Sequence, residues 1–178
     1  MACTDASIRT SIGSGGNYAG HAARENRYEI VKLFARSRTM RRIRYSVLDS
    51  TALDAMIEEK YDSLDVLGLS DDALNSFPTA DLVIEATERR SSRPGFYVVV
   101  EASYTATGSD VTRASERARI LQCATEQDTY AVVAAVRLAP NIEGLVTDNI
   151  DRYLEADGGN EVLWFPITEE DLEPPDPR

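Results

Sequence analysis

Two acidic side chains flank a pair of apolar segments that are typical of adjacent strands. Asp81 opens the first segment, residues 81–86, and Glu101 lies near the end of the second, residues 96–103. A hairpin would bring both carboxylates to one end of the pair, where they repel each other unless a cation lies between them. Mg²⁺ binds through one or two carboxylates together with water and substrate phosphate. The spacing indicates a divalent-metal site that could activate water; alternatively, both acids are solvated at strand ends.

Basic and aromatic residues after the second strand could contact a nucleic acid. Arg113 and Arg117 are four residues apart on the expected helix 109–124, so they share one face. They could bind a substrate phosphate, or they could pair with acids of their own helix or with the sheet edge. Tyr104 could stack on a base, or it could pack as an ordinary partly exposed tyrosine.

The order of these segments resembles a prokaryotic branch of the PD-(D/E)XK nuclease superfamily. The resemblance extends over roughly residues 17–165 and is carried by five segments: 20–28, 41–44, 80–84 (ADLVI), 96–103 (FYVVVEAS) and 110–118 (DVTRASERA). It implies a restriction-endonuclease-like fold and Mg²⁺- or Mn²⁺-dependent hydrolysis of nucleic acid. It also implies that Asp81 and Glu101 are the metal ligands and that Glu25 is an auxiliary acid.

Ser103 occupies the position at which this superfamily carries a lysine that orients or activates the attacking water. Serine has no charge and cannot stabilise a developing negative centre as an ammonium can. Lys32 lies seven residues after Glu25, on nearly the same side of one expected helix, and is either a displaced partner or a solvated lysine. Two functions remain open: a phosphodiester hydrolase impaired at residue 103, or a catalytically inactive nuclease-like domain that serves as a binding or assembly module.

The elements expected around these residues form an α/β fold. Periodicity predicts helices over residues 17–38, 50–60, 109–124 and 141–156, with a short one from 71, and strands over 42–48, 81–86, 96–103, 130–136 and 161–166. The run 130–136 is apolar throughout, which is typical of a central strand buried on both faces. A hairpin followed by a strand–helix–strand crossover predicts a mixed central sheet flanked by helices on both faces.

Composition and chain ends suggest one domain in a cytoplasmic setting. The chain has 178 residues, of which 43% are apolar and 28% charged. Residues 1–16 are expected to be a flexible leader, 17–167 the domain, and 168–178 an acidic, proline-rich disordered tail. No apolar run suits a membrane span and no secretory signal is evident, so no membrane partner is expected. Cys3 and Cys123 are expected to be free thiols, and a single histidine excludes a multi-histidine zinc site.

Charge is unevenly distributed along the chain. The net charge of −11 argues against non-specific adhesion to nucleic acid. Acids concentrate in the final third, whereas an early segment is basic: Arg24, Arg27, Lys32, Arg36, Arg38, Arg41, Arg42 and Arg44. This segment is either a solvated face or a basic rim near a polyanion site. The resemblance to the nuclease superfamily implies as partners a nucleic acid, a second copy of the chain or another protein.

Overall fold

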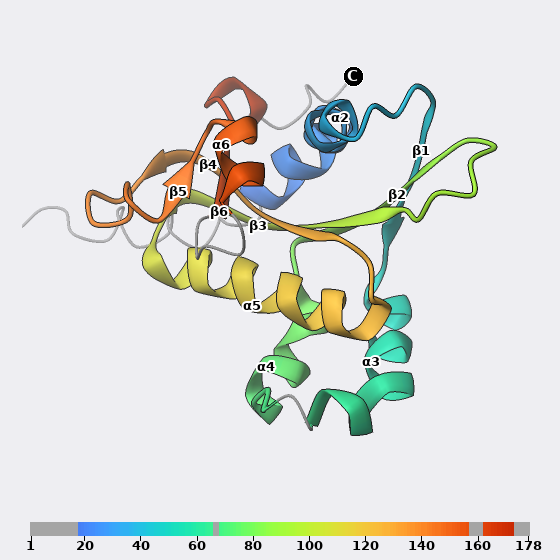
Figure 1. Ribbon diagram of the computed structural model, residues 1–178. Coiled ribbons are helices and arrows are strands. Elements are labelled where there is room, and N and C mark those ends of the chain that lie inside the picture. The colour runs from blue at the N-terminus through green and yellow to red at the C-terminus, as the bar shows by residue number, and fades with distance from the viewer. Residues whose placement is uncertain (1–17, 66–67, 157–161, 173–178) are drawn as a thin grey trace, which may run out of the picture.

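A six-stranded mixed sheet forms the centre of the molecule, with strand order β1-β2-β3-β4-β6-β5. The computed structural model describes residues 18–65, 68–156 and 162–172 (Figure 1). β1–β2 and β2–β3 are antiparallel, whereas β3–β4, β4–β6 and β5–β6 are parallel. The strands are β1 Ile43–Leu48, β2 Leu82–Glu88, β3 Phe96–Ala106, β4 Thr129–Leu138, β5 Val146–Thr147 and β6 Val162–Pro166. The predicted mixed α/β fold is confirmed.

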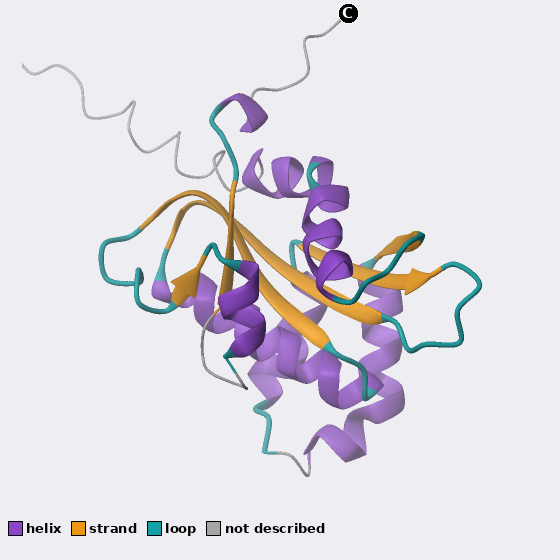
Figure 2. Ribbon diagram, turned by 45° about the horizontal axis from the view of Figure 1, so that its top comes forward, coloured by secondary structure: helices purple, strands orange, loops and turns teal. Residues whose placement is uncertain are grey.

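Helices cover both faces of the sheet (Figures 1 and 2). Residues 18–25 form a first helical segment, and the later helices are α2 Arg27–Ser37, α3 Ser50–Asp65, α4 Asp71–Ser76, α5 Gly108–Thr125 and α6 Ile150–Glu155. Two 3₁₀ turns are η1 Phe77–Thr79 and η2 Glu170–Leu172. In Figure 1, α2 lies above the sheet and α5 lies below it, with α3 and α4 further below. Among the described residues, no helix is both long and apolar enough to cross a membrane.

The hydrophobic core is divided by the sheet into two layers. Successive strand residues point to opposite faces, so each of the central strands supplies both layers. The layer between the sheet and α5 includes Val83, Val99, Val133, Ala114 and Leu121. The layer beneath α2 includes Ile84, Val98, Val132, Ile30 and Phe34. Residues 131–135 of β4 are all buried, as predicted for a central strand.

The connection from β3 to α5 differs from the prediction. The strand was expected to end at residue 103 and the helix to begin at residue 109, but β3 continues to Ala106, and α5 begins at Gly108 after the N-cap Thr107. The strand is longer because it keeps its parallel pairing with β4 up to Ala106 and Leu138. Asp110 accepts hydrogen bonds from Thr107 N at 2.7 Å and Thr107 Oγ1 at 2.8 Å, which fixes the start of the helix.

Other boundaries also differ. The predicted helix 141–156 is wrong in its first half, where β5 pairs with β6, and α6 begins only after the N-cap Asn149. The predicted helix 17–38 is interrupted at Asn26, and α3 extends past residue 60 to Asp65. Of the expected tail, residues 168–172 include η2, whereas residues 173–178 and the leader 1–16 lie outside the described residues.

Candidate functional site

Glu101 is a buried carboxylate in the interior of the sheet. It lies in β3 between β2 and β4, and only 3% of the residue is exposed. Strand alternation places it on the same face as Val99, which packs in the layer between the sheet and α5. An ionised group at this depth needs charged or hydrogen-bonding partners. The partners come from α5.

Two arginines of α5 occupy both carboxylate oxygens of Glu101. Arg113 Nε lies 3.1 Å from Glu101 Oε2, and Arg117 Nη1 forms an ion pair with Oε1. The arginines are one helical turn apart, so both side chains reach the same carboxylate. Of the two alternatives that the sequence left open, the contacts correspond to pairing within the chain and not to arginines left free for a substrate phosphate.

Arg117 also connects the sheet to the segment that precedes β2. Its Nη2 donates to Ser76 O at 2.8 Å and to Thr79 Oγ1 at 2.9 Å. Arg117 is 5% exposed, and its Nε has no hydrogen-bond partner among the described residues. A buried guanidinium that joins α5, β3 and η1 holds these three elements in one arrangement.

Arg113 joins the same network at its solvent side. It pairs with Asp110 through Nη2 and donates from Nη1 to Ser109 Oγ at 2.8 Å. Its side chain is 43% exposed, whereas Asp110 is buried. We call the group of Glu101, Asp110, Arg113 and Arg117 the Glu101 centre. Its two acids and two arginines balance in charge when all are ionised.

Opposing influences act on the Glu101 carboxyl group. Burial is the largest, and it raises the pKa of Glu101. The charge of Arg117 and the hydrogen bonds from both arginines lower it, and the neighbouring charge of Asp81 raises it. The net result is a pKa above the ordinary value of 4.5.

Asp81 lies just before β2 and beside Glu101, which is in the middle of β3, so the predicted proximity of the two residues is found. It directly precedes the residue pair Leu82 and Val100. Its Oδ2 accepts a hydrogen bond from Ala102 N at 2.8 Å, so the side chain extends the ladder by one bond. Arg24 donates to the Asp81 carbonyl from Nε at 3.2 Å and from Nη2 at 3.1 Å.

The residues present do not fit a divalent ion bridging Asp81 and Glu101 in this arrangement. Both oxygens of Glu101 already accept from guanidinium groups, and an ion there would be a third cation beside Arg113 and Arg117. One oxygen of Asp81 is bonded to the backbone. Within residues 18–65, 68–156 and 162–172, no group of three or more acidic, histidine or cysteine side chains could hold a metal.

Within the described residues, no hydrogen bond or ion pair joins the other predicted catalytic residues to the Glu101 carboxylate. Ser103 Oγ donates to Thr105 O at 2.9 Å. Lys32 is on α2, over the opposite layer of the core, and its Nζ lies 3.4 Å from Glu29 Oε2. Glu25 is exposed, and no hydrogen bond or ion pair within the described part of the chain joins it to Asp81 or Glu101.

Tyr104, the predicted base-stacking residue, is engaged within the chain. Its hydroxyl donates to Glu169 Oε1 at 2.7 Å, and this hydrogen bond raises the pKa of Tyr104. The guanidinium carbon of Arg137 lies 4.8 Å from the centre of the Tyr104 ring. One face of the ring is thus covered by a cation.

Sequence reasoning missed a second site, a groove lined by arginines. It is about 710 Å³ in volume and lies between the end of α2 and the β2–β3 turn. The signal was present in two parts, because the basic segment around residues 36–44 and the arginines of turn 89–93 are both visible in the sequence. They become one surface only when β1 pairs with β2.

Comparison of this chain with protein-family models, with curated proteins and with solved structures gives no match. The resemblance to PD-(D/E)XK nucleases therefore remains a hypothesis that rests on the order of motifs, and function has to be argued from the geometry of the site.

Proposed function

We propose that this protein is a catalytically inactive nuclease-like domain that works as a binding or assembly module. The observation that carries the proposal is the engagement of both Glu101 oxygens by Arg113 and Arg117. A carboxylate that ligates Mg²⁺ or Mn²⁺ must present an oxygen to the ion. Here each oxygen is directed at a guanidinium group instead.

The surroundings of Ser103 support the same conclusion. Hydrolysis of a phosphodiester develops negative charge that a nearby ammonium can stabilise. Ser103 carries no charge and donates to the backbone of its own strand, and Lys32 is paired with Glu29 on another face of the molecule. Neither residue supplies the cation that the reaction requires.

The Glu101 centre has a structural role under this proposal. Its ion pairs and hydrogen bonds join α5 to β3 and to the η1 turn. Removing one member of such a buried network leaves an uncompensated charge, so the network favours one packing of these elements. A binding module benefits from such rigidity because its surface groups keep fixed positions.

The competing function is a Mg²⁺- or Mn²⁺-dependent phosphodiester hydrolase. Two observations favour it: Asp81 lies beside Glu101 at the start of β2, and the charge of Asp81 raises the pKa of Glu101. For Glu101 to bind a metal, at least one arginine would have to leave it.

Calorimetric titration with Mg²⁺ and Mn²⁺ tests the proposal, together with a cleavage assay on supercoiled plasmid DNA and single-stranded RNA. We expect no saturable binding at millimolar metal and no cleavage. Asp81→Asn is the matched control, because it removes the charge and keeps the size of the side chain. Saturable binding that disappears in Asp81→Asn, accompanied by metal-dependent cleavage, would overturn the proposal in favour of the hydrolase.

A further inference from the structure

Five arginines line one open groove at the far end of the β2–β3 hairpin. They come from the end of α2, the α2–β1 connection and the β2–β3 turn, and they are Arg36, Arg41, Arg89, Arg90 and Arg93. We call this the arginine groove. An adjoining hollow of about 480 Å³ shares Arg89 and Arg90 and adds Arg44. β2 spans Leu82–Glu88, so at about 3.3 Å per residue the groove lies roughly 20 Å from Asp81 and is separate from the Glu101 centre.

The positive charge of the arginine groove is not balanced within the described part of the chain. All five arginines are exposed, and none lies within ion-pair distance of a carboxylate there. Glu88 is the one acid in the lining, and its Oε1 accepts from the backbone N–H of Arg41 at 3.1 Å. Five guanidinium groups that repel one another across a groove are stabilised by an anion placed between them.

The two sides of the groove are fixed relative to each other. Arg89 N donates to Arg42 O at 2.8 Å, which joins the β2–β3 turn to the α2–β1 connection. The base of the turn is closed by Gly95, where a Cβ would lie 2.5 Å from Ala86 O. The backbones that carry the arginines are therefore set before any ligand binds, which lowers the entropy lost on binding.

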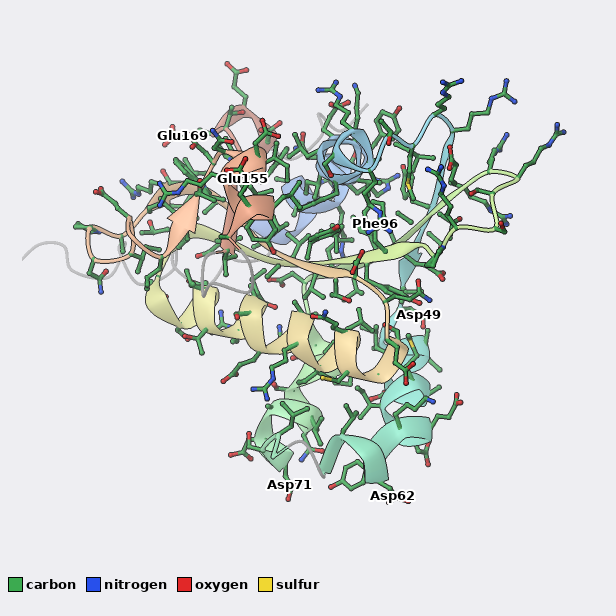
Figure 3. The ribbon with its side chains drawn as sticks, viewed as in Figure 1. Asp49, Asp62, Asp71, Phe96, Glu155 and Glu169 are labelled. Carbon is green, nitrogen blue, oxygen red and sulfur yellow. The ribbon has the colours of Figure 1, made fainter. Side chains whose placement is uncertain are left out.

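The chemistry of the groove favours phosphate. Guanidinium groups bind phosphate oxygens through paired N–H donors, and arginine does so with a planar fork that lysine lacks. The arginines are spread over two adjoining hollows and do not meet at one point, which suits repeated phosphates along a chain. Figure 3 shows nitrogen-tipped side chains projecting from the α2–β1 connection and the β2–β3 turn, whereas the labelled acids Asp62, Asp71, Glu155 and Glu169 lie elsewhere.

Protection of the β1 edge against aggregation is the simpler explanation for surface arginines. It accounts for Arg44, which lies in β1, the edge strand of the sheet. It does not account for Arg36 on α2 or for the three arginines of the β2–β3 turn.

We infer that the arginine groove binds the phosphodiester backbone of a nucleic acid. The inference rests on the proposed binding role and names its ligand. The assay is fluorescence anisotropy of the whole protein with labelled duplexes of about 20 base pairs, or two helical turns, one of DNA and one of RNA, over a range of salt concentrations. Vesicles containing phosphatidylglycerol and inorganic tripolyphosphate serve as competing anions.

The variant Arg41→Gln/Arg89→Gln removes one charge from each side of the groove and leaves a shorter, uncharged polar side chain at each position. Lys60→Gln/Arg119→Gln is the matched control, because it removes two charges from exposed sites on α3 and α5. We expect the groove variant to weaken binding roughly ten- to a hundredfold at ~0.1 M salt and to reduce the slope of log affinity against log salt by about 2. The control should bind as the native protein does. Preference for one duplex identifies DNA or RNA as the source of the backbone.

Three results would overturn the inference: no binding of either duplex, equal loss in groove and control variants, or binding of vesicles or tripolyphosphate at least as tight as binding of the duplexes. Cleavage of the probe distinguishes failure of the proposed function from failure of this inference. If the native protein cleaves the probe with Mg²⁺ but still binds it through the groove, the inactive assignment is wrong and the groove assignment stands.

Discussion

Replacing Arg117 with methionine tests whether the Glu101 centre holds the fold together. Methionine retains much of the side-chain volume but removes the ion pair to Glu101 and both hydrogen bonds to Ser76 O and Thr79 Oγ1. Glu101 is 3% exposed, so its charge would be left in the interior with only Arg113 beside it. Loss of one partner from a buried pair costs about 3–5 kcal/mol. The free energy of unfolding, measured by urea titration and far-ultraviolet circular dichroism, should fall by that amount.

Arg113→Met is the matched control, because it removes the other guanidinium of the same carboxylate. The Arg113 side chain is 43% exposed and Glu101 keeps Arg117, so water can replace part of what is lost. We expect a loss of about 1 kcal/mol or less for this variant. Equal losses in the two variants would refute the reasoning that burial makes Arg117 the main partner.

The pH dependence of Arg117→Met gives an independent check. The charge of Arg117 is the largest influence that lowers the pKa of Glu101, so removing it raises a pKa that already lies above 4.5. Protonated Glu101 carries no charge, so the penalty is absent below the unfolded-state pKa and appears as pH rises through the folded-state pKa. The difference in unfolding free energy between native and variant proteins should be smaller at about pH 5 than at about pH 8. A difference independent of pH would contradict the assignment to Glu101.

Two further predictions concern the sheet. Burial, with Glu85 as the next cause, raises the pKa of Tyr97 to about 12, so the stability that its neutral hydroxyl provides should be present below about pH 10 and lost through about pH 12. Ultraviolet titration against Tyr97→Phe checks this, and ionisation of Tyr97 near pH 10 would contradict it. Gly95→Ala should lower the free energy of unfolding by about 1–3 kcal/mol because its Cβ would lie 2.5 Å from Ala86 O, whereas Gly144→Ala meets no atom within 4 Å and should change it little; equal effects in urea titration would refute the clash.

The proximity of Asp81 and Glu101 could be predicted from the sequence because strand pairing allows few arrangements of the two residues. Two apolar strands joined by a short turn have few possible registers, and alternation then decides the face on which each side chain lies. The start of the short helix at residue 71 was predicted for a similar reason, because capping is local: the Ser70 side chain accepts a hydrogen bond from Ala73 N at 3.2 Å.

The contacts between α5 and Glu101 of the sheet could not be predicted in the same way. The spacing of Arg113 and Arg117 shows that they share a face but not which acid that face meets, because the crossing of α5 over β3 depends on the whole core. The extension of β3 to Ala106 likewise depends on β4, whose pairing residues lie some thirty positions later in the sequence. The arginine groove depends on the pairing of β1 with β2.

Because the charges of the Glu101 centre balance, the centre contributes little to the long-range electric field of the molecule. Two positive and two negative groups packed together cancel one another's field within a few ångströms, so a distant ligand does not sense the centre. The long-range field then comes from other groups, among them the exposed arginines of the groove in a chain whose net charge is −11. A polyanion would be repelled by the net negative charge and attracted by these arginines, so it would be turned toward the groove during its approach.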